Sequence, residues 1–158
     1  MRDAFRKTPV VLQTGPADCG AACLAMVLAA HGKIVPLPQI KRRLRIPRAK
    51  GIDAWKLLKC AASYGLPGEG VAGSPGALRR LALPAILHWR KNHFVVLVRW
   101  KASGAAEIID PASGRLTVGV RKFSLEFSGT ALRFGQVAKA RHRGTEKNKL
   151  PLILADDR

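Results

Sequence analysis

The chain changes character at Pro84, and this change constrains its fold more than any other feature. Before Pro84, apolar residues recur three to four positions apart, as in helices that bury one face. The expected helices cover residues 19–31, 36–44, 52–64 and 77–83. After Pro84, short apolar and β-branched runs alternate with small turns, which is typical of antiparallel strands. The expected strands cover residues 85–89, 93–100, 107–111, 115–120 and 131–134. Helices followed by an antiparallel sheet predict an α+β fold.

Two stretches outside these elements are expected to be connections. The first is the Gly/Pro-rich stretch LPGEGVAGSPG, at residues 66–76. The second is the Phe/Ser-rich segment at residues 123–129, which separates two of the strands. From Gln136 onward the periodicity is lost and only the short apolar run PLIL follows. We therefore expect a domain over residues 1–135 and a basic linker or tail over residues 136–158.

Length and composition exclude several classes of protein. The chain has 158 residues and 47% hydrophobic content, enough for one domain with its own core. No apolar run approaches the roughly 20 residues of a membrane span, and no signal-peptide core precedes the turn at Gly15-Pro16. Three cysteines without paired spacing do not predict a disulfide framework or a zinc site. We expect reduced thiols in a cytosolic setting, with no metal or cofactor.

The charge of the chain is strongly positive. Lys and Arg number 28 against 10 Asp and Glu, a formal net charge of +18. Such a balance is typical of a protein with a polyanionic partner, which could be nucleic acid, an anionic membrane face or an acidic peptide. The alternative, which the sequence favours, is that these charges form solvated basic faces and a flexible tail. The basic clusters occupy residues 41–45, 48–50 and 139–149. Aromatic residues do not interleave with them, so a surface that stacks nucleic-acid bases is not predicted.

Cys19 has the sequence setting of a reactive thiol. It follows the Gly15-Pro16 turn and Asp18, a residue type that often caps a helix, and it begins an alanine-rich apolar run. The positive end of a helix and a nearby imidazole stabilise a thiolate. A thiol hydrolase also needs an acceptor that orients the imidazole, and donors for the oxyanion.

The remaining groups for this chemistry occur in the order of a papain-like thiol hydrolase. Gln13, six residues before Cys19, can supply a side-chain amide to the oxyanion. His93 begins one predicted strand and Asp110 ends the next, so the two ends can meet. Each assignment is weak by itself, but the four residues together favour a thiol hydrolase over a purely structural role for each residue. The candidate catalytic residues are Cys19, His93, Asp110 and Gln13.

The other cysteines and histidines have structural interpretations. Cys23 and Cys60 lie within predicted helices and are expected to be small core residues. His31 ends a predicted helix, where an imidazolium complements the dipole without any further function. His88 lies in an apolar strand and is expected to be packed there, and His142 lies in the polar tail. Asp110 itself precedes a proline, so its alternative role is to start a turn.

Four segments in this order resemble a known family. They are VLQTGPADCGAACLAMVLAAHG, PAILHWRKNHFVVL, IIDPASG and FSGTALRF, within about Thr8 to Phe134. They resemble the peptidase domain at the N-terminus of bacterial peptidase-containing ABC transporters, which are bacteriocin-processing, double-glycine cysteine peptidases. The phrases TPVVLQ, HGKIVPL and SYGL look most like the subgroup that exports modified peptides with nitrile-hydratase-like or lanthipeptide leaders.

The resemblance implies a papain-like fold, a substrate and a set of roles. The family cuts a precursor after a Gly-Gly or Gly-Ala pair, which separates an amphipathic leader from the exported cargo. Matching positions make Cys19 the nucleophile, His93 the general base and acid, Asp110 the orienting carboxylate and Gln13 the oxyanion donor. The implied partners are the precursor peptide and the transmembrane and ATPase domains of an exporter, which this sequence lacks. The domain would then work at the cytoplasmic face of the bacterial inner membrane.

Two other functions stay open at this point. One branch of the family has lost the cysteine and only docks export substrates, which the presence of Cys19 and His93 disfavours. A basic nucleic-acid-binding protein is the other alternative, which the lack of interleaved aromatics disfavours. Under the peptidase interpretation, the clusters at residues 41–45 and 48–50 are expected to steer an acidic leader toward the domain.

Overall fold

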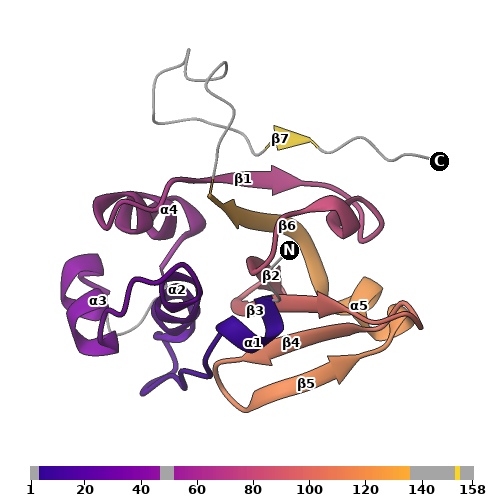
Figure 1. The fold of residues 1–158 in the computed structure, drawn as a ribbon, viewed down its shortest axis with the longest axis horizontal. Helices are drawn as coiled ribbons and strands as arrows, with labels where there is room; N and C mark the ends of the chain where they lie inside the picture. Colours follow the sequence, from indigo (N-terminus) through magenta and orange to yellow (C-terminus); the bar gives the residue numbers. More distant parts are fainter. Residues whose placement is uncertain (1–3, 47–51, 136–151, 154–158) are drawn as a thin grey trace.

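A layer of helices packs against a mostly antiparallel sheet, in a computed structural model that describes residues 4–46, 52–135, 152 and 153 (Figure 1). The α-helices are α1 (Ala4–Lys7), α2 (Cys19–Ala30), α3 (Leu37–Leu44), α4 (Ala54–Ser63) and α5 (Val120–Glu126), with a 3-10 helix η1 (Ala77–Arg80). The strands are β1 (Gly68–Ala72), β2 (Ala85–Trp89), β3 (His93–Trp100), β4 (Ala106–Asp110), β5 (Gly114–Val118), β6 (Phe127–Phe134) and β7 (Leu152–Ile153). No helix among the described residues is long and apolar enough to span a membrane.

Helix α2 is the centre of the helical layer. Every residue from Cys19 to Leu28 is buried, because this run carries no polar face. In Figure 1, α3 and α4 lie beside α2 on one side of the sheet. Helix α3 is amphipathic and buries only Leu37, Ile40 and Leu44, and its Arg42 and Arg43 are exposed.

The seven strands follow the order β5-β4-β3-β2-β6-β1-β7. All neighbours pair antiparallel except β1 and β7, which run parallel. Strands β3 and β4 form the pair that matters for function, since the start of β3 and the end of β4 lie at the same edge. The residues that alternate along β3 face two cores: Val96 packs toward α2, and Val95 packs toward Phe123 of α5.

The predicted α+β architecture is confirmed, but three local predictions are wrong. The expected helix over 77–83 is reduced to the single turn η1. The stretch 66–76 contains β1, which is stabilised by pairing with β6 although its glycines favour a loop. The segment 123–129 holds the end of α5 and the start of β6 instead of a connection. For β1 and β6, strand pairing with partners distant in the sequence overrides the local preference.

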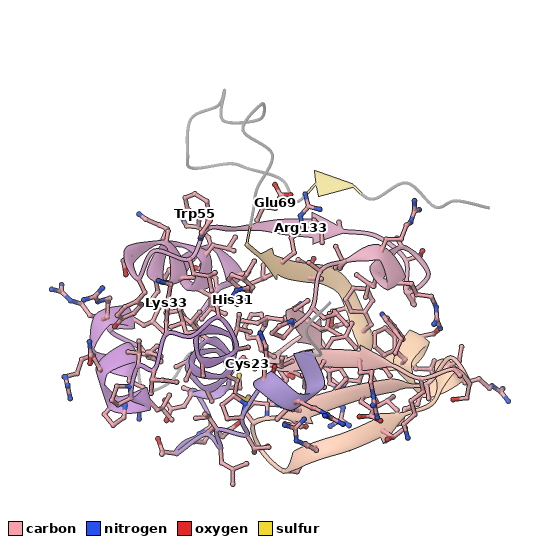
Figure 2. The ribbon with its side chains drawn as sticks, viewed as in Figure 1. Cys23, His31, Lys33, Trp55, Glu69 and Arg133 are labelled. Carbon is pink, nitrogen blue, oxygen red and sulfur yellow. The ribbon has the colours of Figure 1, made fainter. Side chains whose placement is uncertain are left out.

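Strands β1 and β7 lie at the end of the strand order opposite to β5. Glu69 of β1 and Arg133 of β6 form an ion pair across the two strands, and Figure 2 shows their side chains together at this edge. Leu152 and Ile153 extend the sheet beside β1. The other residues of the expected tail, and the basic cluster at 48–50, lie outside the described residues.

Candidate active site

Cys19 is the first residue of α2, as the sequence predicts. Cys19 is 5% exposed, and three hydrogen-bonding partners lower the pKa of its thiol. These partners are the His93 side chain, the backbone N–H of Phe94 and the backbone N–H of Gly20. The two backbone donors could not be found by sequence reasoning, because any residue type supplies them.

The environment of Cys19 favours the thiolate. Burial raises the pKa of the Cys19 thiol, but the hydrogen bond and charge of His93 and the two backbone donors outweigh it, so the pKa lies below its ordinary value. The hydrogen bond to Cys19 raises the pKa of His93, which burial lowers and Asp110 raises again, with a net increase. These opposite shifts stabilise a thiolate next to an imidazolium, which is the reactive form of a thiol hydrolase.

Asp110 orients the imidazole of His93. The His93 Nε2 atom lies 2.8 Å from Asp110 Oδ1, and both side chains are largely buried. The same carboxylate oxygen accepts the backbone N–H of Ala112 at 2.8 Å, which fixes its rotamer. Asp110 thus starts a turn and also holds the histidine, so the two interpretations of this residue are compatible. The contact with Nε2 leaves Nδ1 as the ring nitrogen for Cys19.

Gln13 lies in the segment that leads to Cys19. Its backbone N–H donates to Pro111 O at 2.8 Å, which ties the segment to the end of β4 beside Asp110. Its side-chain Nε2 donates to Gly15 O at 2.9 Å, and its Oε1 is buried without a hydrogen-bond partner among the described residues. An amide nitrogen carries two hydrogens, so one remains for another acceptor. The side chain is held in place but its role as an oxyanion donor stays a prediction.

Asp18 occupies the cap position of α2 but does not cap it. Its side chain makes no hydrogen bond to the first turn of the helix, contrary to the prediction. The carboxylate instead accepts from Thr14 Oγ1 at 2.7 Å and from Lys41 Nζ at 2.8 Å. A competing cation from α3 has replaced the backbone donors, and nothing in the local sequence indicates that contact.

The remaining cysteines and histidines lie outside this group. Cys23 is fully buried on α2, where Figure 2 labels it, and burial raises the pKa of its thiol far above the ordinary value. Cys60 is also buried, with a raised pKa. The ring of His88 packs against Phe94, with centroids 5.3 Å apart, as expected for a packed residue.

His31 and His142 complete the set of histidines. Partial burial, Lys7 and Lys33 lower the pKa of His31, so the expected imidazolium at the end of α2 is disfavoured. His142 lies outside the described residues. Within the parts of the chain that are described, no group of three or more His, Cys, Asp or Glu side chains could hold a metal ion.

Comparison with known proteins gives relatives that share this arrangement of elements. One solved structure, a double glycine motif protease from an AMS/PCAT transporter in complex with the leader peptide, is 40% identical, with a TM-score of 0.78 over 83% of this chain and 93% of that one. The peptidase domain of Streptococcus ComA is 21% identical with a TM-score of 0.73, covering 80% of this chain and 97% of that one, and supports the fold alone.

Curated relatives point in the same direction. The probable microcin-H47 secretion/processing ATP-binding protein of Escherichia coli is 36% identical over 127 residues, or 80% of this chain. The colicin V secretion/processing ATP-binding protein of the same organism is 35% identical over the same length. The chain spans 18% of the length of each of these two relatives. The family model described as Peptidase C39 family matches residues 7–139. The chain, with its papain-like α+β fold, therefore belongs to the peptidase C39 family of cysteine peptidases.

Proposed function

We propose that this domain removes the leader from a precursor peptide by cleaving after a Gly-Gly or Gly-Ala pair. The single observation that carries the proposal is the contact of Cys19, at the start of α2, with an imidazole that Asp110 orients. A solved relative, 40% identical, is a double glycine motif protease in complex with the leader peptide, which supports the substrate class. Cleavage after two tiny residues requires that the enzyme exclude larger side chains at these two substrate positions.

In the first half of the reaction, the Cys19 thiolate attacks the carbonyl carbon of the second small residue. The carbonyl π electrons move to oxygen, and the oxyanion accepts hydrogen bonds from the Cys19 backbone N–H and the free Nε2 hydrogen of Gln13. When the tetrahedral intermediate collapses, the C–N bond breaks and the His93 imidazolium gives its proton to the leaving amine. The cargo departs, and the leader remains as a thioester on Cys19.

In the second half, water replaces the amine. His93, now neutral, takes a proton from the water as its oxygen attacks the thioester carbonyl. The C–S bond then breaks, which returns the thiolate beside an imidazolium and releases the leader as a carboxylic acid that loses its proton to water. Asp110 keeps the ring in one orientation through both halves and is not consumed. No metal or cofactor is needed for these steps.

We also propose the wider setting of the domain. Relatives named as secretion/processing proteins indicate a place beside an exporter, with transmembrane and ATPase domains as partners, at the cytoplasmic face of the inner membrane. The relative named as a lacticin-481/lactococcin-DR transport/processing protein, 30% identical over 125 residues, supports a role in processing an exported peptide. The bound precursor is expected to have an amphipathic helical leader.

The test uses synthetic leader peptides with a Gly-Gly junction, incubated with the domain and analysed by mass spectrometry. We expect two products that meet at the carboxyl side of the second glycine. Cys19→Ala should abolish cleavage and Cys23→Ala should retain most of it, while a Gly→Val change before the cut should block the parent enzyme. Leader binding without cleavage by the parent would instead support a docking domain. Selective binding of RNA or DNA that survives moderate salt would support the nucleic-acid alternative.

Gln13 is tested separately. Gln13→Ala should lower kcat by about 10²- to 10³-fold with little change in KM, because one oxyanion donor is lost. Gln13→Glu, of nearly the same size, should be at least as impaired, since a carboxylate places negative charge beside the oxyanion. Unchanged turnover in Gln13→Ala would remove this residue from the active site.

A further inference from the structure

A charged cluster not used by the mechanism lies directly before the nucleophile. It consists of Asp18, Thr14 and Lys41, the last of which comes from α3. Lys41 Nζ lies 2.8 Å from Asp18 Oδ2 and donates to Thr14 Oγ1 at 3.0 Å. Thr14 Oγ1 in turn donates to Asp18 Oδ2 at 2.7 Å, so the three groups form a closed triangle.

This triangle braces the segment of residues 13–18. The backbone N–H of Asp18 donates to Gly15 O at 3.1 Å, and the Asp18 carboxylate lies against the Gly15 backbone. The Gly15 carbonyl also accepts Gln13 Nε2 at 2.9 Å. The Gly15 carbonyl oxygen therefore accepts from both the Asp18 backbone and the Gln13 side-chain amide. This shared acceptor links the position of Asp18 to the position of Gln13.

We propose that Lys41 is a positioning residue for the oxyanion donor, which it holds through Asp18, Thr14 and Gly15. The inference rests on the proposed peptidase function and deepens it. Lys41 itself does not reach the reacting atoms. Its ammonium fixes a carboxylate, the carboxylate fixes a turn, and the turn sets the direction of the Gln13 amide.

Burial makes the carboxylate depend on this cation. The Asp18 side chain is 8% exposed, whereas the Lys41 side chain is 36% exposed. Burial raises the pKa of Asp18, but the hydrogen bonds of Lys41, Thr14 and Gly15 outweigh it and keep the pKa below its ordinary value. If Lys41 lost its charge, a buried carboxylate would remain with only neutral donors and would turn toward water. That movement would release Thr14 and Gly15.

This role differs from that of other cations near α3. Arg43 stacks on the Tyr64 ring at 4.2 Å and donates to Ser63 Oγ at 2.9 Å, so it joins α3 to α4. Arg42 is exposed on the outer face. The predicted steering cluster at residues 41–45 therefore contains cations with different tasks, and loss of Lys41 should act on turnover instead of on encounter with the leader.

The thiolate should be insensitive to Lys41. The groups that act on the Cys19 sulfur are the His93 side chain and the backbone N–H groups of Phe94 and Gly20, and Lys41 is not among them. The other charged groups around this end of α2 are Asp18 before it and Asp110 on β4. Alkylation of Cys19 needs a thiolate but no oxyanion donor. It therefore distinguishes an effect on the Cys19 thiolate from an effect on the Gln13 amide.

The experiment compares Lys41→Met, Lys41→Arg and the control Lys56→Met, which removes an exposed lysine of α4. For cleavage of a Gly-Gly leader peptide, Lys41→Met should lower kcat by about 10- to 100-fold at nearly constant KM, less than the loss of the donor itself. Lys41→Arg should recover most of the turnover, since a guanidinium can also bind Asp18. Alkylation of Cys19 by iodoacetamide should keep its rate and pH dependence in all three variants.

A double-mutant cycle completes the test. In the Gln13→Ala background, Lys41→Met should reduce kcat less than twofold further, because the group that it positions is already absent. Full additivity of the two changes, or a Lys41→Met variant that turns over like Lys56→Met, would overturn the inference. A parallel loss of alkylation would also overturn it, since Lys41 would then act on the thiol or the fold. If the parent domain cleaves no leader peptide, the peptidase proposal itself fails, which is a distinct outcome.

Discussion

His93 Nε2 and Asp110 Oδ1 lie 2.8 Å apart although 17 positions separate the two residues in the chain. The antiparallel pairing of β3 and β4 brings them together, because the first residue of β3 and the last residue of β4 share one edge of the sheet. Cys19 reaches the same edge from α2. The site therefore lies where the helical layer meets the ends of two strands. Asp110 and His93 should affect the pH dependence of activity and of Cys19 alkylation in different ways.

Asp110→Asn should shift the alkaline limb of the pH profile to lower pH. The hydrogen bond and charge of Asp110 both raise the pKa of His93, and asparagine removes the charge. The imidazolium that protonates the leaving amine is lost as pH rises through the pKa of His93, so a lower pKa ends activity earlier. The measurement is kcat/KM against pH, which reports the free enzyme. His31→Asn is the matched control, and an alkaline limb that stays in place or moves upward in Asp110→Asn would contradict the prediction.

The Cys19 thiol should be alkylated with a pH midpoint below the ordinary 9.0 of a cysteine. His93→Ala should move this midpoint to higher pH, because the hydrogen bond and charge of His93 lower the pKa of Cys19. The rate of iodoacetamide labelling against pH, followed by mass spectrometry of the intact protein, measures both values. Cys19→Ala should block labelling under native conditions, because burial raises the pKa of the Cys23 and Cys60 thiols and disfavours their thiolates. Labelling of Cys23 ahead of Cys19 would show that the nucleophile is misplaced.

Arg42→Glu should raise the KM for an acidic leader peptide at low salt and leave kcat unchanged. Arg42 lies on the exposed face of α3, where a cation acts on encounter and is screened by ions. Initial rates should be measured at about 20 mM salt, where screening is weak, and at about 500 mM, where it is strong. The difference in KM between the variant and the parent should be smaller at the higher salt. Lys56→Glu, on α4, is the control for an equal change in charge. A KM that does not respond at low salt would assign this basic face to another partner, such as an anionic membrane surface.

Gly20→Ala should destabilise the fold, because Gly20 of α2 packs closely against Leu57 of α4 and against Ile52, which precedes α4. A Cβ atom at Gly20 would lie 2.8 Å from Ile52 Cγ2 and 3.2 Å from Leu57 Cδ1, too close without displacement. We expect a loss of about 1–3 kcal/mol in the free energy of unfolding, typical of an overpacked core. Thermal and urea unfolding measure this. Gly119→Ala is the control, because its Cβ would meet no atom within 4 Å at a φ of −69°.

Local patterns in the sequence predicted the parts of the fold that each element determines by itself. The uninterrupted apolar run after Asp18 predicted a buried helix with Cys19 at its start, and the structure has that helix. The alternating runs after Pro84 predicted β2 to β5 within a few residues. The order of Gln13, Cys19, His93 and Asp110 indicated the candidate site, because these residue types occur in the order in which a papain-like thiol hydrolase presents them.

Only the tertiary structure decided the features that depend on distant partners. Strand β1 forms in a glycine-rich stretch because β6 supplies its hydrogen bonds. Asp18 leaves its expected cap because Lys41, on the separate helix α3, offers a charge. The donors around the Cys19 sulfur include backbone N–H groups, which have no sequence signature. Hydrophobic periodicity and helix capping are short-range properties that can be recognised in the sequence. The partner of a buried charge, or of the backbone N–H and C=O groups of a strand, depends on which distant groups folding brings within reach.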